Sequence, residues 1–197
     1  MTHYFSDNSD LKENRKEHSF SFYGNEFTFT TDNGVFSKKE IDEGTIILLK
    51  ALMEETIKGQ ILDLGCGYGV ISIILKKILD SAELTAVDIN PRAVELTNFN
   101  SKLNEVEIEA YVSDGYEKIN KSFDVVITNP PIRTGKKVIY KLFEDTYSHL
   151  VPNGVFYLVI RRKQGAESAM NKLNELFGNC ELIERSKGYW VLKAKKA

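Results

Sequence analysis

The chain has 197 residues, of which 42% are hydrophobic and 27% charged, and its formal net charge is -2. This composition is typical of a soluble globular protein, and the length fits a single domain with a substantial core. With this net charge the protein is not a polycation that would bind nucleic acid through its overall charge. The sequence contains no run of about twenty apolar residues, so no membrane span is predicted.

The N-terminus and the cysteines indicate the compartment. The opening stretch MTHYFSDNSDLKENRK is polar and lacks the apolar block of a secretory signal. Cys66 and Cys180 are two isolated thiols, which predict neither a disulfide framework nor a metal site. We therefore expect a cytoplasmic protein that binds no metal and no membrane.

Residues 1–40 are polar and aromatic-rich, and we expect them to form an N-terminal extension that packs on the core. Within them, SFSFYGNEFTFTT alternates as two strands joined at Gly24-Asn25 would. A helical pattern begins at Ile41 and ends near Gly59. Residues 41–197 then form the core, so the whole chain is predicted to be one domain.

Strands and helices alternate from residue 60 onward. The predicted strands are 60–64, 83–87, 107–112, 123–128, 155–160, 180–185 and 188–194, and the predicted helices are 70–79, 91–103, 137–150 and 167–177. This alternation indicates an α/β, Rossmann-like protein with a mostly parallel sheet and helices on both faces. Ligands of such sheets bind beyond the carboxyl ends of the strands, so the turns after the strands are the places to search for a site.

The turn after the first of these strands is rich in glycine. ILDLGCGYG places Gly65, Gly67 and Gly69 where the backbone can approach a ligand closely. Phosphate-binding turns read G-x-G-x-x-G, whereas here the third glycine comes one residue early and Asp63 precedes the first. A carboxylate repels phosphates but suits an ammonium group, so the turn favours S-adenosylmethionine as the ligand.

Acidic residues follow the next two strands. Asp88 is placed to accept from both ribose hydroxyls, and Ile89 to lie against the adenine. The alternative role for Asp88 is an N-cap, but Asn90 is better placed for that role. Asp114 is placed to accept from the adenine amino group, and its alternative is a solvated Asp-Gly turn.

The strand FDVVIT leads into NPPIRTGKK. Asn-Pro by itself favours a turn, but at the rim of a nucleoside pocket it has a chemical use. The prolines Pro130 and Pro131 make the segment rigid. The side-chain oxygen of Asn129 and the carbonyl of Pro130 then accept the two N–H bonds of one exocyclic amine. These neutral acceptors aim the nitrogen lone pair at a sulfonium methyl group, and no general base is required before attack.

These residues resemble the class I S-adenosylmethionine-dependent methyltransferases, and more narrowly the small ribosomal RNA guanine-N2 methyltransferase family. The resemblance covers HYFS at 3–6, GVFSKKEIDEGTIILL at 34–49, DLGCGYG at 63–69, VDINPRAVELTNFN at 87–100, SDGYE at 113–117 and NPPIRTGK at 129–136. It implies a seven-stranded sheet that ends in an antiparallel hairpin, with residues 41–197 as the catalytic domain. It also implies that Phe36, Ser37 and Thr45 border the cofactor site, and that Asn129 to Ile132 carry catalysis. Cys66, Gly115 and Asn129 are further residues expected to contact the cofactor.

The sequence departs from this family's relatives at two points. Many amino-methylating enzymes follow Asn-Pro-Pro with a Tyr or Phe that stacks on the target base, and here the residue is Ile132. Stacking would then come from Tyr4, Phe5 or Phe36, or the base would be held differently. Larger members also carry an N-terminal domain with no counterpart in this sequence, so a partner subunit or an assembled ribosomal particle is expected to help recognise the substrate.

Basic residues flank the proposed catalytic turn. A charge run is often only solvated surface, but two runs are predicted to lie on one rim of the pocket and to contact RNA phosphates: Arg133, Lys136 and Lys137, and Arg161, Arg162 and Lys163. A base within duplex RNA would have to be extruded to reach the pocket.

The leading hypothesis is methyl transfer from S-adenosylmethionine to an exocyclic amine of an RNA base, most simply guanine N2 in ribosomal RNA. Asn-Pro-Pro would equally serve adenine or a protein glutamine amide as acceptor. A non-catalytic RNA-binding module with the same fold is a further alternative, disfavoured by the intact acidic set. A NAD-type dehydrogenase is disfavoured by the glycine spacing and Asp63.

Overall fold

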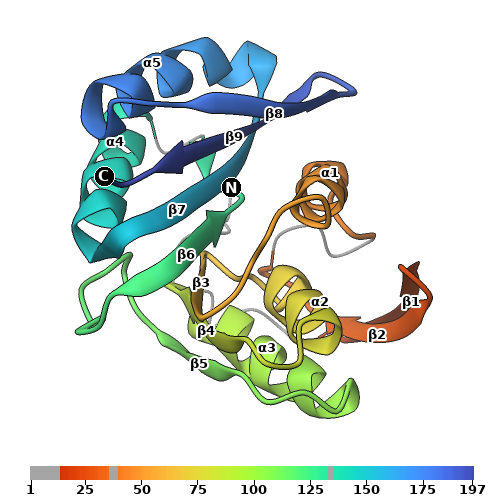
Figure 1. Ribbon diagram of the computed structural model, residues 1–197. Coiled ribbons are helices and arrows are strands. Elements are labelled where there is room, and N and C mark those ends of the chain that lie inside the picture. The colour runs from red at the N-terminus through yellow and green to blue at the C-terminus, as the bar shows by residue number, and fades with distance from the viewer. Residues whose placement is uncertain (1–13, 36–39, 133–134) are drawn as a thin grey trace.

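A seven-stranded sheet forms the centre of the computed structural model, which describes residues 14–35, 40–132 and 135–197 (Figure 1). The strand order is β5-β4-β3-β6-β7-β9-β8. Strands β3 to β7 are parallel, and β9 lies antiparallel between β7 and β8. Their bounds are β3 Gln60–Leu64, β4 Glu83–Asp88, β5 Glu109–Val112, β6 Phe123–Thr128, β7 Leu150–Arg161, β8 Glu181–Ser186 and β9 Tyr189–Lys195. The predicted fold class, with its C-terminal antiparallel hairpin, is confirmed.

Helices cover both faces of this sheet (Figure 1). One face carries α1 Glu43–Leu52, α2 Val70–Ile78 and α3 Pro91–Leu103, and the other carries α4 Lys136–His149 and α5 Ala166–Phe177. A hydrophobic core lies on each face of the sheet, and successive strand residues point into one core and then the other. Ile61 packs with α1 and α2, while Leu62 packs with α4 and α5. Both faces are buried, which explains the nearly continuous apolar runs of the strands. Among the described residues, no helix is long and apolar enough to cross a membrane.

The N-terminal extension contributes a hairpin of β1 Lys16–Phe22 and β2 Asn25–Thr31. Its turn is Tyr23-Gly24, one residue before the predicted Gly24-Asn25, and both residues have positive φ, at 46° and 75°. Such a turn matches the twist of the two strands. Phe27 and Phe29 of β2 are fully buried in the core beside α2 and α3, so the hairpin packs on the domain.

Several predicted boundaries differ from the structure by two or more residues. The strand expected at 155–160 begins at Leu150, because Leu150 pairs with Phe123 before residues 151–154 bulge out of the ladder. The first helix ends at Leu52, well before Gly59, which instead turns the chain into β3 with φ +84°. The strand expected at 107–112 begins at Glu109. Turn-forming residues in a sequence indicate irregular backbone, but they do not show whether the hydrogen-bonded pairing of two strands ends at that point or continues past a bulge.

Candidate active site at the carboxyl edge of the sheet

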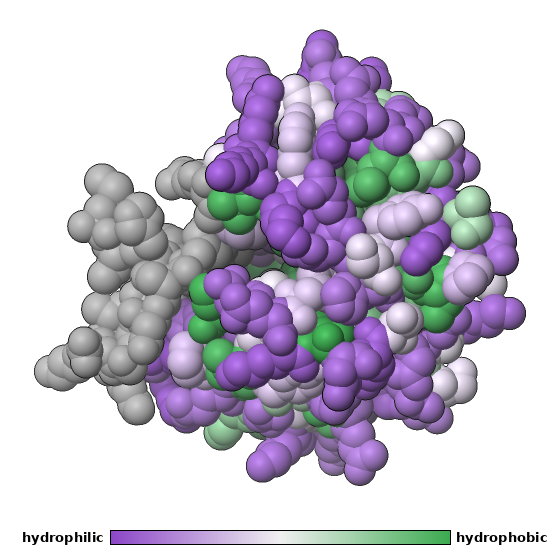
Figure 2. Space-filling view, turned by 90° about the vertical axis from the view of Figure 1, so that its left-hand side faces the viewer, coloured by the Kyte–Doolittle hydropathy of each residue, from purple (hydrophilic) through white to green (hydrophobic). Residues whose placement is uncertain are grey.

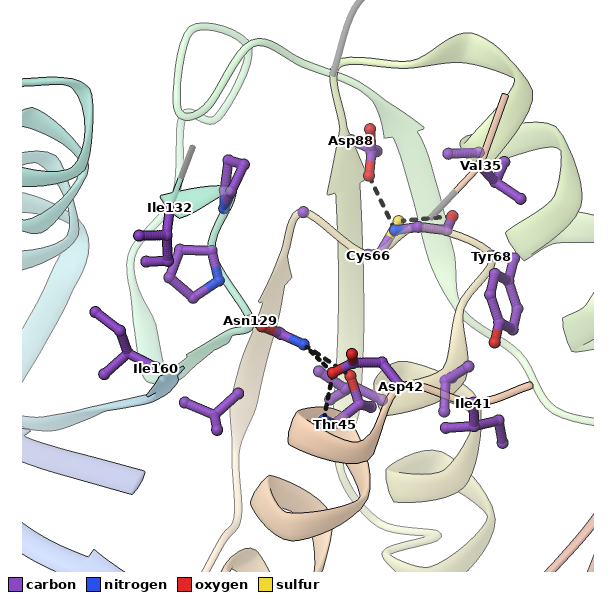
Figure 3. A pocket seen from close by; sticks show the side chains of 18 of the residues that line it. Val35, Ile41, Asp42, Thr45, Cys66, Tyr68, Asp88, Asn129, Ile132 and Ile160 are labelled. Atoms are coloured by element: carbon purple, nitrogen blue, oxygen red, sulfur yellow. Dashed lines mark hydrogen bonds between the residues drawn. The ribbon is translucent and has the colours of Figure 1, made fainter. Parts of the chain in front are cut away.

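A cavity of about 640 Å³ lies where β3, β4, β6 and β7 end, beside the start of α1 (Figure 3). It brings together ten of the residues predicted from the sequence: Thr45, Gly65, Cys66, Gly67, Asp88, Asn129, Pro130, Pro131, Ile132 and Arg161. The sheet order explains this meeting, because parallel strands place their carboxyl ends at one edge.

The glycine turn forms one wall of the cavity. The backbone N–H groups of Gly65 and Cys66 donate to the carbonyl of Val87 at 2.9 and 3.0 Å, which ties the turn to β4. Gly67 has φ +57°, and a Cβ there would point into open space. Gly69 has φ +93°, but its Cβ would come within 2.9 Å of Ile73 Cδ1 and 3.0 Å of Thr97 Cγ2. Gly67 therefore exposes backbone to a ligand, whereas Gly69 allows α2 and α3 to pack closely and lies outside the cavity wall.

Asp88 ends β4 at the cavity wall. Its Oδ2 accepts from Gly67 N and its Oδ1 from Asn90 N, both at 2.9 Å. Burial raises the pKa of Asp88, while its backbone hydrogen bonds oppose that shift. An ionised carboxylate has about four acceptor positions, so acceptor capacity remains after these bonds. Asn90 caps α3 by accepting from Arg92 N at 3.1 Å, as predicted, so Asp88 is not used as the cap.

Asp63 occupies a different place from the one predicted. It is fully buried behind the glycine turn and does not line the cavity. Its Oδ2 accepts from Ser72 N at 3.1 Å and from the Ser72 hydroxyl. The start of α2 has no side-chain cap of its own, since Gly69 precedes it, and the Asp63 carboxylate fills that need. Burial raises the pKa of Asp63 to about 7. The expected contact with an ammonium group is therefore replaced by a bond to a helix start.

Asn129 follows β6 and is held by α1. Its Nδ2 donates to Asp42 Oδ2 and to Thr45 Oγ1, each at 3.0 Å (Figure 3). Asp42 is the N-cap of α1, and the same Oδ2 accepts from Thr45 N at 3.0 Å. The sequence reasoning missed Asp42. The signal was present, since an Asp directly before a helical pattern is a typical cap.

The proline segment is stiffened by a tight turn. Ile132 N donates to the carbonyl of Pro130 at 2.9 Å. The second lone pair of that carbonyl stays available, so Pro130 and Asn129 can both act as acceptors at the cavity. Ile132 and Ile160 give this part of the wall an apolar surface.

The far end of the cavity is built by the C-terminal strands. Arg161 Nε donates to the Tyr189 hydroxyl at 2.8 Å, and the guanidinium carbon lies 4.6 Å from the centre of the tyrosine ring. Tyr189 and Gln164 also line the cavity. The sequence predicts neither, because nothing in a closing hairpin marks a tyrosine as part of a site whose Asn129 lies 60 residues earlier in the chain.

Several predicted residues lie away from the cavity wall. Ile89 is 37% exposed, and Asp114 is exposed in a turn where its carbonyl accepts from Glu117 N at 3.1 Å. Gly115 lies in the same turn. Asp114 thus lies in the solvated turn considered as its alternative role, and its contact with an adenine amino group stays a prediction. The predicted residues Phe36, Ser37, Arg133, Tyr4 and Phe5 lie outside the described residues.

The basic residues divide into two groups. Arg161 lines the cavity, whereas Arg162 and Lys163 lie on the short 3-10 helix Arg162–Gln164 and are exposed. Lys136 and Lys137 begin α4 and are also exposed, and Lys136 Nζ donates to Ser168 Oγ at 3.3 Å. We call the four exposed residues Lys136, Lys137, Arg162 and Lys163 the basic rim.

Comparisons with known proteins agree with this geometry. A family model described as "Methyltransferase small domain" matches residues 26–193. A Bacillus subtilis protein named uncharacterized protein YbxB is 42% identical over 197 residues, which is 98% of each chain. A Shewanella loihica protein named ribosomal RNA small subunit methyltransferase C is 35% identical over 75% of this chain and 44% of its own length.

Among solved structures, a T. thermophilus protein is similar with a TM-score of 0.84 and 30% identity. It is described as a 16S rRNA N2 methyltransferase, RsmC, in complex with AdoMet and guanosine. The match covers 93% of this chain and 51% of that one. The chain thus spans the full length of the Bacillus relative but about half the length of these two methyltransferases.

Proposed function

We propose that this chain, which belongs to the methyltransferase small domain family, methylates the exocyclic N2 amine of a guanine in small-subunit ribosomal RNA. Its methyl donor is S-adenosylmethionine, and the residues at the cavity fit that cofactor. Asp88 keeps acceptor capacity for the ribose hydroxyls. Gly67 leaves space where a side chain would otherwise stand. When bound, S-adenosylmethionine supplies an electrophilic methyl group on its sulfonium.

The observation that carries the proposal is the state of the Asn129 amide. Both N–H bonds of its Nδ2 are used on Asp42 and Thr45, so its Oδ1 is the atom left for an acceptor amine. Oδ1 and the Pro130 carbonyl are two neutral acceptors side by side in the chain, which match the two N–H bonds of one planar amine. Holding both bonds orients the nitrogen lone pair, so the residues act through positioning and complementary polarity rather than as a general base.

The choice of guanine rests on the relatives and on the acceptor end of the cavity. The Shewanella and T. thermophilus proteins are named for ribosomal RNA, and the latter was solved with guanosine. In this chain, Arg161 stands at the cavity wall with its Nε on Tyr189. An arginine that still has unused N–H groups can donate to guanine O6 and N7, whereas adenine presents an amine donor in place of O6.

The test is tritium transfer from labelled S-adenosylmethionine to total RNA, small ribosomal subunits, free guanosine and DNA, followed by nucleoside analysis. We expect label in N2-methylguanosine from RNA or subunits. Label recovered in N6-methyladenosine or in protein would replace guanine by one of the other acceptors. Absence of label from every substrate would contradict the proposal.

In the same assay, Asn129→Ala should lower turnover by on the order of a hundredfold or more, because the amine loses one of its two oriented acceptors. Affinity for S-adenosylmethionine, measured by calorimetry, should stay nearly unchanged. The matched control is Asn174→Ala on α5, an exposed asparagine whose Nδ2 bonds only to Met170 O among the described residues. Unchanged turnover in Asn129→Ala would remove Asn129 from the mechanism.

A further inference from the structure

We infer that Asp42 and Thr45 are positioning residues that hold the Asn129 amide in one of its two possible orientations. The inference rests on the proposed function, since orientation matters only if Asn129 receives an amine. It concerns a group that does not itself need to touch the substrate. Asn129 directly follows β6, and its two partners, Asp42 and Thr45, lie at the start of α1, 87 and 84 residues earlier in the chain.

The chemistry of the partners fixes the direction of the amide. A carboxylate accepts hydrogen bonds and cannot donate while ionised. Asp42 Oδ2 therefore faces Nδ2 of Asn129, because the flipped amide would bring two oxygens together. Thr45 Oγ1 takes the second N–H bond. Figure 3 shows both bonds running from the amide nitrogen toward the start of α1.

The flipped amide would be inactive toward the proposed acceptor. It would present an NH₂ group to the exocyclic amine, and two donors facing each other cannot form a hydrogen bond. An asparagine without Asp42 and Thr45 would sample both orientations. Since an active site works by holding groups in the productive geometry before the reaction, the two contacts raise the fraction of molecules that can react.

Asp42 is itself held in place. Its Oδ2 caps α1 through Thr45 N at 3.0 Å, and Leu48 and Leu49 of that helix are fully buried. The helix start also lies against Tyr189: a Cβ on Gly44 would come within 2.7 Å of the Tyr189 ring and 2.9 Å of Asp42 Oδ2. The carboxylate is therefore anchored to the same sheet that carries Asn129.

The variants separate capping from orientation. Asp42→Ser keeps a residue that caps helices well, but its hydroxyl is too short to serve Thr45 N and Asn129 together. Thr45→Val removes the second acceptor with little change in shape. We expect each variant to lower turnover about tenfold and the pair to approach the loss in Asn129→Ala. The melting temperature should change little, and turnover is compared at saturating S-adenosylmethionine because Thr45 and Asp42 line the cavity.

Two control variants test whether the loss of turnover comes from the lost acceptor rather than from the lost charge. Asp42→Asn should retain most of the turnover, because its single oxygen can still accept from both Thr45 N and Asn129 when the helix is capped. Glu43→Gln makes the same change of charge one residue along, at an exposed side chain that pairs with Lys187, and should behave as wild type. A uniform loss in all of these variants would contradict the inference.

A coupling experiment tests whether Asp42 acts through Asn129. In an Asn129→Ala background, Asp42→Ser and Thr45→Val should cause no further loss of turnover, because there is no amide left to orient. Losses that simply multiply would show that the two residues act independently of Asn129 and would overturn the inference.

A readout without substrate separates this inference from the proposed function. The side-chain amide signals of Asn129 in a ¹⁵N spectrum are identified by their loss in Asn129→Ala. In Asp42→Ser/Thr45→Val these signals should shift, and their hydrogen exchange should accelerate at least about tenfold, because both protecting bonds are gone. Unchanged signals would overturn the inference even if RNA is methylated. Shifted signals without any RNA methylation would uphold the orientation and reject the guanine proposal.

Discussion

At the scale of single residues, Asp63 and Asp88 show how two acids after adjacent strands come to different uses. Asp88 is at the cavity with acceptor positions left, whereas Asp63 is buried against Ser72. Position along the strands explains the difference, because Asp63 lies within β3, paired with Ala86, whereas Asp88 lies two residues further along the same face, at the end of β4. Asp63 shares a face of β3 with Ile61, which packs beneath α2, so its side chain is directed at the start of that helix.

The buried carboxylate predicts a pH dependence of stability. The pKa of Asp63 rises from an ordinary value of 3.8 to about 7 in the folded protein. Between these values the folded state binds more protons than the unfolded state, so the free energy of unfolding falls as pH rises through this window. The fall contributed by Asp63 should be on the order of a few kcal/mol, and Asp63→Asn should lack it.

Urea unfolding of both proteins at pH 5, 6, 7 and 8 measures this effect. The gap between wild type and Asp63→Asn should move in favour of the variant as pH rises, while any constant offset from the new amide stays the same at each pH. Asp80→Asn, at an exposed acid, serves as the control. Parallel curves for wild type and Asp63→Asn would show that Asp63 does not hold its proton in the folded state.

At the scale of elements, α3 binds the N-terminal hairpin by imitating a strand. Asn104 accepts from Thr28 N at 3.0 Å and donates to Thr28 O at 2.8 Å. Asn100, one helical turn earlier, does the same for Thr30 at 2.7 and 2.9 Å. Side chains four apart on a helix lie on one face, and alternate residues of a strand present their backbone on one edge. The two asparagines therefore satisfy the outer edge of β2.

Asn100 also reaches the glycine turn, because its Nδ2 donates to the carbonyl of Tyr68 at 2.9 Å. The hairpin, α3 and the cavity wall thus share one polar side chain. Asn104 has no such link to the turn among the bonds of the described residues, and apart from Thr28 its Nδ2 donates only to the carbonyl of Asn100, at 2.8 Å.

Asn104→Ala should destabilise the protein by about 1–3 kcal/mol, because it leaves the part-buried Thr28 N–H and C=O without their partner. Amide exchange at Thr28 should accelerate more than exchange in β3 or β6, since the edge opens locally. Urea unfolding and hydrogen exchange measure the two effects. Asn174→Ala is the control for loss of an asparagine on a helix surface. Equal stability of Asn104→Ala and wild type would show that the clamp contributes nothing.

At the scale of the whole molecule, basic residues cluster at one place although the net charge is slightly negative. The net charge is -2, yet the four residues of the basic rim gather at the starts of α4 and α5, where β6 and β7 end. The face shown in Figure 2, which includes α4, is mostly hydrophilic, and its hydrophobic residues form small separate patches. A polyanion that enters the cavity from this rim would meet cations first.

If RNA phosphates contact the rim, Lys137→Gln/Lys163→Gln should weaken RNA binding and lower the magnitude of the slope of log affinity against log salt by about 1.4–1.8, since each lost phosphate contact contributes about 0.7–0.9. Affinity for S-adenosylmethionine should not change. The matched control is Lys58→Gln/Lys102→Gln, two exposed lysines at the amino edge of the sheet, one just before β3 and the other in the last turn of α3. An identical salt slope for the rim variant and wild type would place the RNA elsewhere.

The sequence by itself determined the features that depend on near neighbours in the chain. Periodicity predicted the order of strands and helices, and the residues just after β3, β4 and β6 marked the edge where the cavity lies, because a turn directly follows its strand. Tertiary structure alone decided which side chains face one another there. The bond from Asn129 to Asp42 spans 87 residues, and Tyr189 reaches the cavity only because β9 inserts beside β7. Such contacts depend on strand order and on the packing of α1, which no local pattern encodes.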